Sequence, residues 1–111
     1  MTEGAVDSER TARDRTLLVE LCVDLHDRLP SAGLRDKLRL GLGQVGVDLV
    51  NADGEAFDPF AHEALGEVST GDSTLEGMVA ATQRSGYRDH GRLAREPAVL
   101  VYRVAHDGHR D

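Results

Sequence analysis

The sequence predicts an α+β fold, in which two short amphipathic helices precede a small β-rich domain of short strands. Three patterns support this class: a leucine stripe at helical spacing between residues 17 and 29, a weaker stripe after Ser31, and strand-like runs from residue 47 onward. A chain of 111 residues is long enough for one modest core and too short for two independent ones. We therefore expect a single globular unit with short appendages.

Composition and charge exclude several classes of protein. The net charge of −7 arises from 20 acidic and 13 basic residues, and a chain that repels phosphate has weak means of holding DNA or RNA. The sequence shows no basic leader before an apolar stretch and no apolar run of about 18 residues, so neither export nor membrane insertion is indicated. The single cysteine, Cys22, cannot form an internal disulfide. We expect a cytoplasmic protein that binds neither nucleic acid nor a membrane.

The first helix is predicted from near Thr16 to Leu29, where Pro30 disfavours a further α-helical residue. The residues that share its apolar face are Leu17, Leu18, Leu21, Cys22, Leu25 and Leu29. Val19 and Val23 lie outside this stripe, so the helix has more apolar surface than one neighbour can cover. A bundle of four helices from two subunits would cover the excess. Residues 1–15 are polar and lack an apolar period, which predicts a disordered start.

A second helix is predicted to begin after Ser31 and to fray near its end, because Gly41 and Gly43 each weaken a helix by about 1 kcal/mol relative to alanine. Residues 16–46 would form this helical region, and residues 47–105 a β-rich head. Within the head, residues 47–50, 65–70 and 98–105 have strand patterns, residues 88–92 have a turn pattern, and residues 74–87 suit either a helix or a strand. Residues 106–111 are expected to be a flexible tail.

Two separated segments carry the most specific signal in the chain. FDPFAHEALGEV at 57–68, and GYRDHGR at 86–92 with the apolar strand after it, resemble the GrpE family of nucleotide exchange factors for bacterial Hsp70 chaperones. The positions that match the family's residue types and spacings are Phe57, Asp58, Pro59, His62, Ala64, Gly86, Tyr87, Gly91, Arg92, Arg95, Val99 and Val101. A weaker similarity extends over roughly residues 17–105. The resemblance favours a strand within residues 74–87.

The resemblance implies a homodimer that docks on the ATPase domain of a DnaK-type Hsp70, opens its nucleotide cleft and releases ADP, without a catalytic group, cofactor or metal of its own. In the family the two short helices form a four-helix bundle across the dimer. Here the bundle core would comprise Leu17, Leu18, Leu21, Leu25, Leu29, Leu38 and Leu42. Family members usually carry a long paired helix upstream, whereas the polar residues before Leu17 would span at most about 22 Å as a helix. The chain therefore resembles a short form that lacks the long helix.

The same resemblance implies which residues contact the chaperone: Phe57, Asp58, Pro59, Arg92 and Val101, with Gln83 as a further candidate. An arginine at a hairpin tip can form a charge-assisted contact, and an apolar anchor beside it supplies burial. Plainer interpretations stay open. Asp58 and Pro59 also suit a turn or a helix start, and Arg92 also suits an ordinary solvated hairpin.

Two other functions are alternative hypotheses. A protein-interaction module that docks on an Hsp70 or another partner without opening it would use a similar surface. A small metal-dependent or hydrolytic enzyme is disfavoured, because His62 and Glu63 lack a second histidine at helical spacing for zinc. Ser69, Thr70 and Ser73 likewise lack a glycine-flanked nucleophile motif. We expect His62 to bond a nearby backbone group instead.

Overall fold

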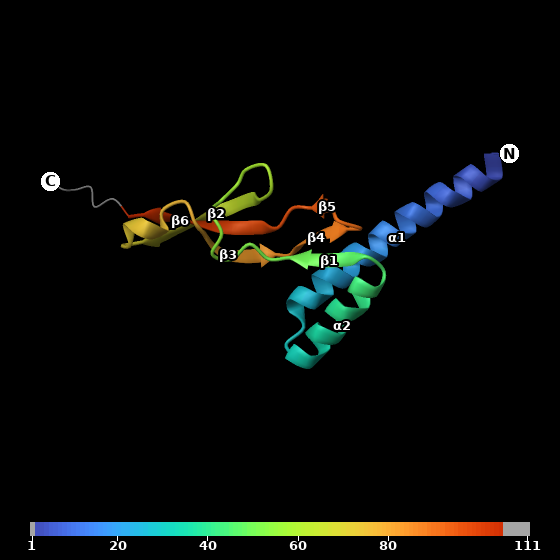
Figure 1. Ribbon diagram of the computed structural model, residues 1–111, viewed down its shortest axis with the longest axis horizontal. Helices are drawn as coiled ribbons and strands as arrows, with labels where there is room; N and C mark the ends of the chain where they lie inside the picture. The colour runs from blue at the N-terminus through green and yellow to red at the C-terminus, as the bar shows by residue number, and fades with distance from the viewer. Residues whose placement is uncertain (1, 106–111) are drawn as a thin grey trace.

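The computed structural model describes the backbone of residues 2–105 and the side chains from Asp7 onward. The tail predicted for residues 106–111 lies outside the described residues. Two helices precede two small sheets (Figure 1), which confirms the α+β class. The elements are α1 (Thr2–Arg28), α2 (Ala32–Gln44), β1 (Val47–Val50), β2 (Glu63–Thr70), the short 3₁₀ helix η1 (Ser73–Leu75), β3 (Val79–Arg84), β4 (Gly86–Asp89), β5 (Arg92–Arg95) and β6 (Ala98–Val104).

The first helix is much longer than predicted. α1 begins at Thr2, so the expectation of a disordered start is wrong for residues 2–15. The segment pairs opposite charges four residues apart, as in Glu9 and Arg13, and no proline interrupts it. Extending an anchored helix adds one hydrogen bond for each residue fixed and needs no new nucleus. The N-terminal half of α1 projects beyond the sheets (Figure 1), so its polar composition reflects exposure rather than disorder.

The junction between the helices agrees with the sequence. α1 ends at Arg28, directly before Leu29-Pro30, and α2 begins after Ser31. The Ser31 hydroxyl oxygen accepts a hydrogen bond from the backbone N–H of Leu34 at 3.2 Å, which caps the new helix. α2 stops at Gln44, and Gly46, with a φ of +87°, turns the chain into β1.

The strands of the predicted head form two sheets. The first sheet has the strand order β1-β4-β5 with antiparallel neighbours, and the second has the order β2-β6-β3. In the second sheet the central strand β6 is parallel to β2 and antiparallel to β3. The ambiguous residues 74–87 contain part of η1, then β3 and the start of β4. The first sheet packs against the helices through a core that the two share.

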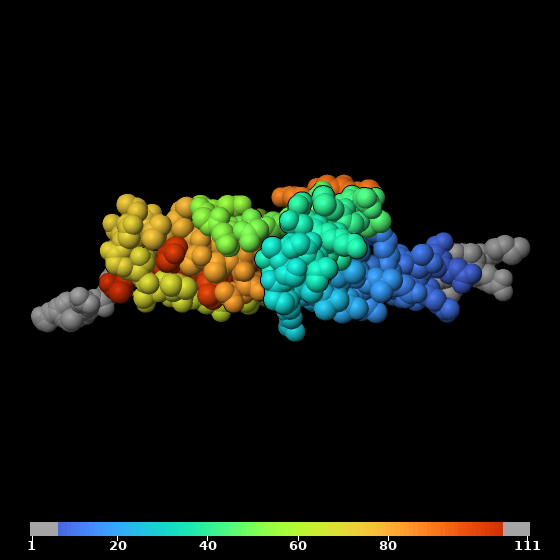
Figure 2. Space-filling view, turned by 90° about the horizontal axis from the view of Figure 1, so that it is seen from below, coloured from blue at the N-terminus to red at the C-terminus, as the bar shows by residue number. Residues whose placement is uncertain are grey.

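Two small cores correspond to these two sheets. The first joins the helices to the first sheet and contains Val19, Val23, Leu42, Val47 and Tyr87; the second contains Ala52, Val79, Val99 and Val101, with Phe57 packed against them. The Cα radius of gyration is 18.3 Å, whereas a compact chain of this length would have about 13 Å. Helices and second sheet accordingly occupy opposite ends of an elongated body (Figure 2).

Candidate functional site

The FDP loop, residues 57–62, is a turn organised by Asp58 and His62. The backbone N–H of Asp58 donates to Nδ1 of His62 at 3.0 Å, and the N–H of His62 donates back to the carbonyl of Asp58 at 2.8 Å. The carboxylate of Asp58 also accepts from the N–H of Phe60 at 2.9 Å. His62 is 6% exposed and its ring lies 5.8 Å from that of Phe57. Its bond to the backbone confirms the structural role expected for this histidine.

The exposed crest of this loop is Asp58, Pro59 and Phe60. Phe60 is 89% exposed, the largest value among the exposed large hydrophobic residues of the described chain. Sequence reasoning missed it, although an aromatic residue directly after a proline-containing turn was a usable signal. An exposed aromatic side chain beside a carboxylate suits contact with another protein better than it suits solvent.

The second exposed feature is the β4–β5 hairpin. Its two turn residues, His90 and Gly91, have φ values of +52° and +85°, as the type I′ turn of a two-residue hairpin requires. Arg92 is the first residue of β5, is exposed, and lies opposite Asp89 in the strand register. The predicted turn at residues 88–92 is therefore confirmed, with Arg92 at the foot of the turn.

An ion pair fixes this hairpin to α1. The guanidinium of Arg15 contacts both carboxylate oxygens of Asp89, at 2.6 and 3.2 Å, and also donates to the carbonyl of Val45 at 2.8 Å. The hydrogen bond from Arg15 lowers the pKa of Asp89, with a smaller contribution from His90, and the same bond raises the pKa of Arg15. Both groups are held in their charged forms.

A second set of contacts ties the first sheet to the C-terminal part of α1. Arg95 donates to the carbonyl of Ser85 at 2.7 Å, lies 3.1 Å from the Asp24 carboxylate without hydrogen-bond alignment, and stacks over Tyr87 with 5.6 Å from its guanidinium carbon to the ring centre. Asp27 accepts from the N–H and the hydroxyl of Ser85 at 2.8 and 2.6 Å. The helix and the sheet are thus anchored at two points.

Comparisons with known proteins show which family the FDP loop and the hairpin are typical of. The sequence pattern described as GrpE matches residues 33–103, which include both the FDP loop and the hairpin. The chain belongs to the GrpE family. It is 38% identical over 107 residues to Protein GrpE of Corynebacterium glutamicum, covering 89% of this chain and 47% of the relative. It is 36% identical over 81 residues to Protein GrpE of Corynebacterium diphtheriae, covering 73% of this chain and 36% of the relative. The chain therefore spans between a third and a half of the length of these relatives.

The residues implied by the GrpE resemblance fall on different parts of the chain. Phe57 and Val101 meet in the second core, whereas Arg92 belongs to the first sheet. Val101 is 2% exposed because it lies on the central strand β6 and faces the core, so its side chain supports the surface and is not part of it. Gln83 is exposed on β3 and lines a pocket with Asp24, Asp27, Arg28 and Arg84.

The predicted dimer residues of this GrpE-family chain divide into two groups. Leu17, Leu18, Leu21 and Leu25 are between 51% and 67% exposed, and they form the leucine face of α1. Leu29 and Leu38 are half-buried, and Leu42 is buried in the first core. Val19 and Val23, which lie outside the leucine stripe as predicted, are 6% and 0% exposed and pack in the first core of the single chain. Their position on the opposite side of the helix frees the leucine face.

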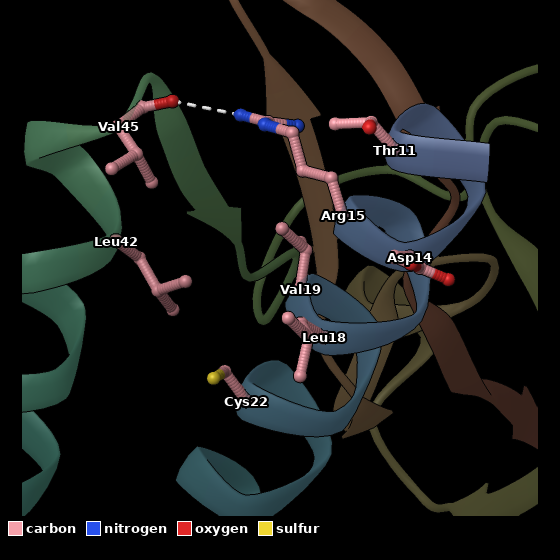
Figure 3. A pocket seen from close by; sticks show the side chains of 8 residues that line it. All are labelled: Thr11, Asp14, Arg15, Leu18, Val19, Cys22, Leu42 and Val45. Atoms are coloured by element: carbon pink, nitrogen blue, oxygen red, sulfur yellow. Dashed lines mark hydrogen bonds between the residues drawn. The ribbon is translucent and has the colours of Figure 1, made fainter. Parts of the chain in front are cut away.

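An open apolar pocket of about 490 Å³ extends beside the leucine face, between α1 and α2 (Figure 3). The residues that line it are Thr11, Asp14, Arg15, Leu18, Val19, Cys22, Leu42 and Val45. Within residues 2–105 no helix has a stretch apolar enough to cross a membrane, and no group of three or more acidic, histidine or cysteine side chains could hold a metal ion.

Proposed function

We propose that this chain is a nucleotide exchange factor that docks on the ATPase domain of a DnaK-type Hsp70 in the cytoplasm and speeds the release of ADP. The observation that carries the proposal is the GrpE pattern over residues 33–103, which spans both exposed features described above. The activity requires no catalytic residue, cofactor or metal. It requires only a surface that fits one conformation of the partner better than another.

The contact surface that we propose combines the FDP loop with the Arg92 hairpin. Asp58, Pro59 and Phe60 supply an exposed aromatic and a carboxylate on a turn held by buried His62. Arg92 supplies a forked cation that can pair with a carboxylate of the partner. Gln83, which is exposed on β3, is proposed as a further polar contact.

The proposed mechanism is thermodynamic linkage. A factor that binds the open ATPase domain more tightly than the closed one lowers nucleotide affinity by the same ratio. Each tenfold preference corresponds to about 1.4 kcal/mol. The opening itself is a rotation of lobes within the partner, so the rigidity of this chain matters more than any motion of its own.

We also propose a homodimer formed through the leucine face of α1. Leu17, Leu18, Leu21 and Leu25 expose a contiguous apolar stripe, which folded monomers rarely leave in water. The apolar pocket beside the stripe offers room for side chains of a second copy. Leu42, expected in the dimer core, instead stabilises the single chain.

The test is stopped-flow release of labelled ADP from the Hsp70 of the same organism. At saturating concentration the protein should accelerate release, and Arg92→Ala should require a higher concentration for the same rate. Arg13→Ala is the matched control, since Arg13 is an exposed arginine of α1 outside the proposed surface. No acceleration at saturation would contradict the proposal. Binding without acceleration would identify an interaction module that docks without opening its partner.

A further inference from the structure

Three segments far apart in the sequence converge at the turn end of the β4–β5 hairpin. Arg15 comes from α1, Val45 and Gly46 from the α2–β1 corner, and Asp89 and His90 from the end of β4 and its turn. The N–H of His90 donates to the carbonyl of Gly46 at 2.8 Å, beside the contacts that Arg15 makes with Asp89 and Val45. We call this arrangement the Arg15 clasp. Figure 3 shows Arg15 reaching from α1 across to Val45.

The clasp leaves little room for the hairpin to move. A Cβ atom added to Gly46 would lie 2.6 Å from the His90 ring, so the ring is in close contact with the corner. Nδ1 of His90 lies 2.8 Å from a carboxylate oxygen of Asp89, and the other carboxylate oxygen meets Arg15 at 2.6 Å. The carboxylate is thus held from two sides, by the helix and by the turn.

Arg92 is the residue whose position depends most directly on this arrangement. It directly follows the turn and is the cross-strand partner of Asp89. Fixing the Asp89 backbone fixes the strand pair from which the Arg92 side chain leaves the hairpin. A long arginine side chain can reach a partner in many directions, so holding its backbone reduces the ordering that binding would require.

The ion pair is poorly placed to serve stability alone. The side chains of Arg15 and Asp89 are 38% and 27% exposed, and exposed ion pairs contribute little to folding. Two-pronged contact between a guanidinium and a carboxylate instead supplies geometric specificity. The pair is therefore better suited to orienting the hairpin than to holding the fold together.

We propose that Arg15 is a positioning residue for Arg92: by gripping Asp89 and the Val45 carbonyl, it holds the hairpin against α1 so that Arg92 meets the Hsp70 partner in one orientation. This inference rests on the proposed function. It adds a residue of α1 that touches neither the FDP loop nor the partner, and it makes the pose of the hairpin depend on an intact helix around Arg15.

The test is a double-mutant cycle on the full chain, with the affinity for the Hsp70 ATPase domain measured by titration calorimetry. Arg15→Ala should weaken binding about 5-fold and Arg92→Ala should weaken it about 10-fold or more, as truncation of a hot-spot arginine does. The double variant should be no weaker than Arg92→Ala alone, because Arg15 acts only through Arg92. Arg13→Ala, two residues away on the same helix, should bind as the unmodified protein does.

A second measurement needs no partner. Amide hydrogen exchange at residues 90–92 of the free protein should become at least several-fold faster in Arg15→Ala and in Asp89→Asn, while exchange in β6 stays unchanged. Additive losses in the cycle, or an unchanged affinity in Arg15→Ala, would overturn the positioning role. If Arg92→Ala binds normally, the proposed contact between Arg92 and the partner is wrong. Unchanged hydrogen exchange at residues 90–92 in Arg15→Ala would in addition show that Arg15 does not hold the hairpin.

Discussion

At the scale of single residues, Gly86 shows how closely the strands approach one another. A Cβ atom at this position would lie 2.5 Å from the backbone nitrogen of Pro97 and 2.7 Å from its Cδ, and it would also meet the carbonyl oxygen of Arg95. Backbone atoms cannot move aside as a flexible side chain can. The glycine of the GY pair is therefore required by packing between β4 and the chain that leads into β6.

Gly86→Ala should accordingly destabilise the fold by about 1–3 kcal/mol, the usual cost of overpacking. Urea denaturation followed by circular dichroism would measure it as a lower midpoint with an unchanged slope. Gly41→Ala is the matched control, because no atom lies within 4 Å of its added Cβ and it sits in α2. That substitution should raise stability by up to about 1 kcal/mol, and equal effects of the two would contradict the packing argument.

Tyr87 should make the protein sensitive to alkaline pH. Burial raises the pKa of its hydroxyl above the ordinary value of 10.0, and the negative charge of Glu20 adds to the shift. Above about pH 10 an unfolded tyrosine loses its proton while the folded one retains it, so stability falls as pH rises towards the folded-state pKa. In Tyr87→Phe this part of the decline should vanish. Urea midpoints at pH 9, 10 and 11 would test it, and parallel curves for the two proteins would contradict the assignment.

At the scale of elements, α1 combines two apolar faces with different purposes. Val19 and Val23 attach the helix to its own sheet, and the larger leucines stay outside. Periodicity predicted the helix and its leucine stripe and placed the two valines outside that stripe, but it did not show which face would meet the chain's own sheet. Side-chain size does not decide which face meets the chain's own sheet. The small valines allow a close approach of helix and strand, which the sequence alone does not show.

Elements defined by local chemistry were predictable, and those defined by distant contacts were not. Pro30 and Ser31 mark the helix junction, and His90-Gly91 marks the hairpin, through backbone effects that need no tertiary context. The helical state of residues 2–15 depends on continuation of an anchored helix. Strand pairing, which places β6 between β2 and β3, depends on contacts across the whole chain. The exposed site residues Asp58, Pro59 and Arg92 lie on such local turns, whereas the burial of Val101 follows from strand pairing.

At the scale of the whole molecule, the two sheets lie end to end, and the N-terminal half of α1 extends beyond them at the end away from the second sheet (Figure 1). The principal extents of 72, 35 and 19 Å describe a rod rather than a sphere. Each small core buries few side chains, and the contacts of Arg15, Asp24 and Asp27 supply polar links between helix and sheet. Such a shape separates the leucine face of α1 from the second sheet along the long axis.

Because the leucine face of α1 is separate from the second sheet, Leu21→Glu should affect the dimer alone. Leu21 is 54% exposed in the single chain, so a charge there should abolish the dimer without unfolding the protomer. Sedimentation should show a monomer with an unchanged circular dichroism spectrum. Small-angle X-ray scattering of this monomer should give a radius of gyration near 18.3 Å, well above the roughly 13 Å of a compact chain of this length.

Asp36→Glu on α2, which is exposed and keeps its charge, serves as the control and should remain dimeric. A variant that sediments as a dimer would remove the leucine face from the interface, and a compact monomer would contradict the rod-like arrangement of helices and sheets.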